Sequence, residues 1–151
     1  MPNWCNNMLN VSGDGQFFKT VTEELDFEKA VPVKDDTLEE AVEQWGTKWT
    51  PSDCSYWNHE GIHRFEFSTP WCPPDTFILN ASKRFKDALF QLVYLEIGSD
   101  FCGIIECKNG EVIRNDHISS MVNAFPQDIY PLFYEEFEGI SLTCEDVLKL
   151  M

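Results

Sequence analysis

Apolar and polar residues follow the period of a β-strand in several short segments of the chain. Residues 62–68 show the pattern most clearly, because Phe65 and Phe67 alternate there with Arg64 and Glu66, as expected for a half-buried strand. The short connection over residues 58–61 ends in glycine and joins this strand to the one before it. We therefore predict strands over residues 4–12, 52–57, 62–68 and 90–97.

A second hairpin follows the last of these strands. Asn109 and Gly110 lie between two apolar segments, residues 101–107 and 111–114, and an Asn-Gly pair in this setting is the strongest short-range signal for a hairpin turn. We expect both strands to extend the same sheet.

Helical periodicity separates the predicted strands. Apolar residues recur every three or four positions over residues 16–25 and again from Pro73 to Leu89, which predicts two amphipathic helices that pack on a sheet. Residues 26–49 follow neither period consistently and form a predicted insertion after the first helix. Within it, Thr37 begins a capping-box sequence and predicts a short helix that ends near Gly46.

The order strand, helix, strand, strand, helix, strand predicts an α+β protein with the split βαβ arrangement called ferredoxin-like. This topology has an antiparallel sheet with two helices on one face. We assign it to residues 1–115, including the insertion and the added hairpin. Residues 116–151 are predicted to form an acidic helical extension, with helices over 118–125 and 127–137, that packs on the same domain.

Composition and charge limit the classes of function. A chain of 151 residues that is 43% hydrophobic and 14% aromatic is expected to fold as one globular unit, and its net charge is −15. A field this negative repels phosphate backbones and anionic lipid surfaces, so we expect neither duplex nucleic-acid binding nor membrane binding. The first residues show no basic leader or apolar stretch, and no segment approaches a membrane span, so a cytoplasmic location is expected.

Four sequence blocks in register identify a family resemblance. They are Met-Pro-Asn-Trp-Cys-Asn-Asn at 1–7, Gln-Trp-Gly-Thr-Lys-Trp at 44–49, Phe-Ser-Thr-Pro-Trp-Cys-Pro-Pro at 67–74 and Tyr-Leu-Glu-Ile-Gly-Ser-Asp-Phe-Cys-Gly at 94–103. Together they resemble the YubB-type ferredoxin-like domain family of phages and conjugative plasmids, over roughly residues 1–110. The resemblance implies the fold and a gene of a mobile element inside a bacterium. It implies no activity, because the family has no established biochemical function.

A tryptophan-rich segment is the first candidate for partner binding. Trp45, Lys48 and Trp49 lie within five residues, and Trp71 follows the neighbouring hairpin. A cation over an indole ring, or an exposed indole used as an anchor, provides a large contact area. The alternative is that these tryptophans close the core, which is the commoner use of the residue.

The acidic residues give a second candidate surface. Residues 14–43 hold ten acidic and three basic side chains, and residues 128–151 hold six and one. We choose Glu39, Glu40, Glu135 and Glu136 to represent these stretches. Carboxylates in such numbers can imitate the phosphates of a nucleic acid and bind a basic DNA-handling protein of the host. The alternative is a solvated surface that keeps the protein soluble.

Two other functions remain open on the sequence alone. Asp53, Glu96 and Asp100 lie on or beside strands, and converging carboxylates can hold Mg²⁺ for chemistry on a nucleic acid or nucleotide. The open sheet face of this topology can also bind a single-stranded nucleic acid through aromatic side chains, although the net charge opposes it. The sequence favours a protein-binding accessory factor of a phage or plasmid that acts without catalysis or a cofactor.

Overall fold

The computed structural model describes residues 3–51, 53–120 and 143–150. It confirms the α+β class, with one open antiparallel sheet of six strands in the order β2-β3-β1-β4-β5-β6. The first four strands in this order form the ferredoxin-like sheet, and β5 and β6 extend it beyond β4. The strands are β1 (Trp4–Ser12), β2 (Cys54–His59), β3 (Ile62–Pro70), β4 (Leu89–Glu96), β5 (Phe101–Lys108) and β6 (Glu111–Ile118).

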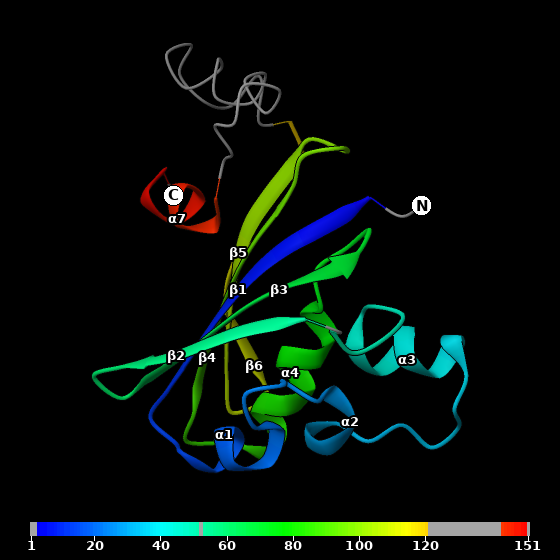
Figure 1. Ribbon diagram of the computed structural model, residues 1–151, viewed down its shortest axis with the longest axis vertical. Helices are drawn as coiled ribbons and strands as arrows, with labels where there is room; N and C mark the ends of the chain where they lie inside the picture. Colours follow the sequence, from blue (N-terminus) through cyan, green and yellow to red (C-terminus); the bar gives the residue numbers. More distant parts are fainter. Residues whose placement is uncertain (1–2, 52, 121–142, 151) are drawn as a thin grey trace.

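Four helices lie on one side of the sheet and a fifth lies on the other (Figure 1). In the first group, α1, α3 and α4 lie at predicted positions, whereas α2 falls in the insertion where no helix was predicted. The helix α3 begins after Thr37 and ends at Gly46, as the capping signals indicate. The fifth helix is the only part of residues 121–151 that the structure describes, together with Thr143 before it. The helices are α1 (Gln16–Val21), α2 (Phe27–Ala30), α3 (Leu38–Trp45), α4 (Asp75–Arg84) and α7 (Cys144–Leu150).

Several predicted boundaries differ from the structure; the second predicted helix, for example, ends at Arg84 instead of reaching Leu89. The first helix ends at Val21 instead of reaching Leu25, because both Thr22 and Leu25 have positive φ angles, 60° and 52°. The strand β6 continues to Ile118, beyond residue 115 where the sequence places the end of the ferredoxin-like domain. The helices predicted over 118–125 and 127–137 fall mostly outside the described residues.

The main core lies between the sheet and helices α1 to α4. The Phe17 ring of α1 meets the Phe90 ring edge to face at 5.0 Å between centroids and the Phe65 ring at 6.1 Å. The Phe27 ring of α2 stacks on Phe77 of α4 at 3.9 Å. These aromatic contacts attach each helix to the sheet or to its neighbour.

A smaller core lies on the opposite face of the sheet, under α7. Cys144 and Val147 of this helix are buried, and an ion pair joins Glu145 to Arg64 of β3. The side chains beneath the helix belong to β1, β4 and β5 and are Met8, Val93, Leu95, Cys102 and Ile104. The helix α7 therefore covers apolar sheet surface that is otherwise left open by the ferredoxin-like topology. No helix in the described residues is long and apolar enough to cross a membrane.

A polar ladder crosses the same face of the sheet beside α7. Arg64 donates to Asn10 at 2.9 Å, Asn10 to Gln91 at 2.9 Å, and Gln91 to Glu106 at 2.9 Å. Arg114 then pairs with Glu106 at 3.9 Å. The ladder links five neighbouring strands, and each member satisfies the polar group of the next.

The Tyr94 side chain extends across the neighbouring strand β5, on the face of the sheet that carries helices α1 to α4. Its hydroxyl contacts Nδ1 of His117 at 2.7 Å, although β5 lies between the strands of the two residues. This contact requires glycine at position 103, because a Cβ there would overlap the Tyr94 ring and lie 2.6 Å from the carbonyl oxygen of Asp116. Burial also raises the pKa of Tyr94 above its ordinary value, so the phenol stays neutral.

We predict that Gly103→Ala lowers the free energy of unfolding by about 1–3 kcal/mol, the usual cost of overpacking. The added methyl group forces Tyr94 off His117 or moves β5. Urea denaturation measures the change. The matched control is Gly15→Ala, where a Cβ would meet nothing within 4 Å. Equal stability of the two variants would contradict the prediction.

Candidate protein-binding surface

The helix α3 and the segment after it form the frame of the candidate surface. Thr37 caps the helix by accepting a hydrogen bond from the backbone N–H of Glu40 at 3.2 Å. Gly46 ends it in the left-handed conformation, with φ of 78°. A Cβ at Gly46 would collide with the Asp75 carboxylate, so this glycine allows the end of α3 to lie against the start of α4. The segment that carries Lys48 and Trp49 therefore begins beside the first turn of α4.

Trp45 belongs to the core. Its side chain is 7% exposed, and its indole N–H donates to the carbonyl oxygen of Val31 at 2.8 Å. Its ring also meets Phe27 edge to face at 5.7 Å. A buried indole with its N–H satisfied contributes to packing and offers no contact area to a partner. We therefore leave Trp45 out of the binding surface that the sequence suggested.

Lys48, Trp49 and Trp71 are placed differently. Trp49 is 41% exposed and Trp71 is 44% exposed. The Lys48 ammonium lies 4.3 Å from the centre of the Trp71 ring, a cation–π contact worth about 0.5–1 kcal/mol at an exposed position. The backbone N–H of Trp71 donates to Asn3 at 2.8 Å. Trp71 is therefore held in place while one side of its ring system remains accessible.

Cys72 ties this segment to α3. Its thiol donates to the carbonyl oxygen of Gly46 at 3.0 Å. Burial raises the pKa of Cys72 above its ordinary value, the nearby Asp75 carboxylate raises it further, and Lys48 lowers it. Because the thiolate is the reactive form, a raised pKa makes Cys72 a neutral hydrogen-bond donor and a poor nucleophile.

The outer side of α3 combines carboxylates with apolar groups. Glu39 is exposed, whereas Glu40 is half-buried and accepts from the backbone N–H of Lys34 at 3.5 Å. Leu38 and Val42, four residues apart, are both exposed, while Ala41 and Trp45 of the same helix are buried. The sequence reasoning missed Leu38 and Val42. Leu38 and Val42 are four residues apart, as are Ala41 and Trp45. Because the two pairs lie on different sides of the helix, the sequence could have indicated that one pair faces solvent.

We call this region the α3–Trp71 surface. It joins an acidic and apolar helix face to two exposed indoles and one ammonium group. Of the four glutamates that represented the acidic stretches, Glu39 and Glu40 lie on it, and Glu135 and Glu136 fall outside the described residues. Its members are Leu38, Glu39, Glu40, Val42, Lys48, Trp49 and Trp71.

The structure does not bring the three candidate metal ligands together. Glu96 is buried and accepts hydrogen bonds from the backbone N–H groups of Gly98 and Ser99, so it stabilises the turn after β4. Asp53 precedes β2, which is three strand spacings from β4, or about 14 Å. Asp100 accepts from the Ser120 hydroxyl at 3.3 Å. Among the described residues, no group of three or more histidine, cysteine or acidic side chains is arranged to hold a metal ion.

The sheet face opposite α4 carries few aromatic groups in its described part. Trp57 lies on the edge strand β2, with the Arg64 guanidinium 6.0 Å from its ring centre. On this face the two central strands carry Met8 and Asn10 of β1 and Gln91, Val93 and Leu95 of β4, and α7 covers the apolar members. Stacking of single-stranded bases needs a row of accessible aromatic rings. The described strands offer such a ring only at their margins, where Trp57 and Trp4 are exposed.

The two kinds of tryptophan give a direct test of these assignments. We predict that Trp45→Ala lowers the free energy of unfolding by about 3–5 kcal/mol, because it empties core volume and removes the bond to Val31. Trp71→Ala is expected to change it by less than about 1 kcal/mol, since it removes one exposed cation–π contact. Chemical denaturation of both variants measures the difference, and a larger loss for Trp71→Ala would contradict the placement.

Comparison with known proteins agrees with this architecture. Residues 44–127 match the family model described as the ferredoxin-like domain in Api92-like protein. The crystal structure of a protein api92 from Yersinia pseudotuberculosis is similar, with a TM-score of 0.51 and 15% sequence identity over 63% of this chain and 39% of that one. No curated protein matches. At this identity the likeness concerns the fold, and this chain spans well under half of the api92 protein. Because the family match covers more than half of its residues, this chain belongs to the family of ferredoxin-like domains in Api92-like proteins.

Proposed function

We propose that this protein is an accessory factor of a phage or conjugative plasmid, that it binds a protein of the bacterial host cytosol, and that it acts without catalysis. The observation that carries the proposal is the α3–Trp71 surface, where exposed apolar and aromatic side chains lie beside carboxylates on one helix and its continuation. Indoles and apolar side chains of this kind are typical anchors of protein interfaces. The link to mobile elements is supported by the resemblance to the YubB-type family.

The proposed partner is a basic DNA-handling protein. The net charge is −15, and the stretch from residue 14 to 43 that includes most of α3 has more than three times as many acidic as basic side chains. Such a field accelerates the approach of a basic partner, and the apolar and aromatic groups then add short-range contact. The acidic side chains take the place of nucleic-acid phosphates in this proposal. The same field repels duplex DNA and anionic membranes.

We predict that the double variant Glu39→Lys, Glu40→Lys loses partner capture. The new lysine side chains repel a basic partner. A loss of about 1.4 kcal/mol of binding free energy raises the Kd about tenfold and lowers the captured amount accordingly. The tagged protein and its variant are used to capture proteins from a bacterial lysate at low and at high salt, followed by mass spectrometry. The wild type is expected to retain a basic DNA-handling protein at low salt, and circular dichroism checks that the variant folds.

The matched control is Glu60→Lys, Asp87→Lys. It changes the net charge by the same amount at two exposed positions away from α3. We expect this control to retain the partner. If both double variants capture it equally well, or both lose it equally, the α3–Trp71 surface is not the binding site.

A further inference from the structure

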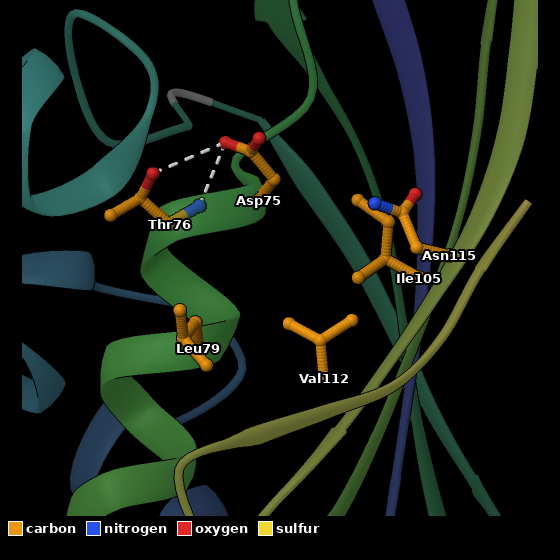
Figure 2. Close-up of a pocket in the computed structure, with 6 residues that line it drawn as sticks. All are labelled: Asp75, Thr76, Leu79, Ile105, Val112 and Asn115. Atoms are coloured by element: carbon orange, nitrogen blue, oxygen red, sulfur yellow. Dashed lines mark hydrogen bonds between the residues drawn. The ribbon is translucent and has the colours of Figure 1, made fainter. Parts of the chain in front are cut away.

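A second recognition feature lies on the other side of α4, against the edge of the sheet. The structure has a cavity of about 110 Å³ between α4 and the strands β5 and β6. Figure 2 shows that residues of the first two turns of α4 form one wall and residues of the two strands form the other. The lining residues are Asp75, Thr76, Leu79, Ile105, Val112 and Asn115. We call this cavity the β6 groove.

A bulge in β6 creates the strand wall of the groove. Val112 pairs with Cys107 and Arg114 pairs with Glu106, so Ile113 is an extra residue with no partner on β5. Val112 and Asn115 are three residues apart, so on a regular strand their side chains would point to opposite faces. The extra residue in the bulge turns both side chains to the same face. Val112 and Asn115 therefore both face α4, as Figure 2 shows.

The strand beside the groove lies at the edge of the sheet. One side of the β6 backbone has no strand partner in the described sheet. Val112 is 48% exposed and Ile113 is 55% exposed. The strand β6 contains no proline or lysine, the residues that most often shield an edge, and its protection is limited to the bulge and three charged side chains. An extended peptide can add to such an edge through its backbone, while a neighbouring pocket selects one of its side chains.

The lining of the groove selects the chemistry of that side chain. Leu79, Ile105 and Val112 provide apolar walls, and the groove becomes polar at Asp75 and Asn115. Oδ1 of Asp75 accepts from the backbone N–H of Thr76 at 2.8 Å and from its hydroxyl at 3.3 Å. Oδ2 accepts no hydrogen bond from the described residues. An aliphatic stem that ends in a cation fits this combination of surfaces.

The size of the groove argues for a side chain instead of a small-molecule cofactor. Pockets for small molecules usually measure about 300–1,000 Å³, and the β6 groove measures about 110 Å³. The net charge of −15 favours a cationic group over a neutral or anionic one.

We propose that the β6 groove binds an arginine or lysine side chain of an extended partner segment, and that this segment pairs with β6 as a seventh strand. The inference rests on the proposed function, since it names the chemistry of a protein partner. None of the residues lining the groove is a member of the α3–Trp71 surface, although Asp75 also abuts Gly46 at the end of α3. The two proposals can therefore fail independently, and different variants test them.

The test uses a synthetic octapeptide that alternates arginine and valine and has blocked ends. Binding to the full chain is measured by calorimetry, and hydrogen exchange of residues 111–118 reports on β6. We expect the peptide to bind and to slow exchange in β6. Replacing each arginine with citrulline, an uncharged side chain of similar shape, is expected to weaken binding by about two- to fivefold, as loss of an ion pair at an exposed carboxylate does.

Two protein variants separate the groove from general attraction to an acidic protein. Asp75→Asn keeps an oxygen for Thr76 but removes the charge, and we expect it to weaken binding by about two- to fivefold. Asp53→Asn removes one exposed charge before β2 and is expected to leave binding unchanged. Equal binding by the two variants, protection of β2 in place of β6, or no binding of the peptide by the wild type would each overturn the proposal. None of these results depends on whether the Glu39 and Glu40 variant captures a host protein.

Discussion

The aromatic packing around Phe17 is the interaction on which the other elements depend. Its ring touches Phe65 of β3, Phe90 of β4 and Phe85 just after α4, at centroid distances of 6.1, 5.0 and 5.5 Å. The Phe17 side chain thus joins α1, the end of α4 and the strands β3 and β4. Phe27 extends the cluster by stacking on Phe77, which attaches the insertion to α4. The position of α3 depends on these contacts, because α3 packs mainly on α4.

The position of α4 then determines both recognition features. Its first turn lies between the end of α3 on one side and the bulged strand β6 on the other. Asp75 belongs to both arrangements: it abuts Gly46 at the end of α3, and it lines the β6 groove. Both features are therefore anchored to a packed helix, although Lys48, Trp49 and Trp71 lie in the short segments that flank α3 and β3. A surface held in this way loses little conformational entropy on binding, which favours affinity without a large contact area.

The sequence was sufficient for most strands, for the two hairpins and for α3, because alternation, Asn109-Gly110 and the Thr37 cap are local signals. The features that it could not provide depend on contacts between distant segments. Trp45 and Trp71 occur in similar sequence settings, yet only the fold buries the first against Val31 and exposes the second. The bulge at Ile113 has no local signature in residues 111–118, and it alone places Val112 on the groove side. The carboxylates of the predicted metal site were likewise separated by the strand order.

The small number of cations strengthens the acidic character of the protein. Only 11 lysine and arginine residues are present, and several of them are engaged within the fold. Arg64 pairs with Glu145 and Arg84 donates to two backbone carbonyl groups of the insertion, while Lys48 lies over Trp71. Cations used in this way cannot turn toward the exposed carboxylates of α3 and neutralise them. In the proposed complex, a basic partner would meet those carboxylates, and the indoles and the β6 groove would distinguish it from cations that bind through charge alone.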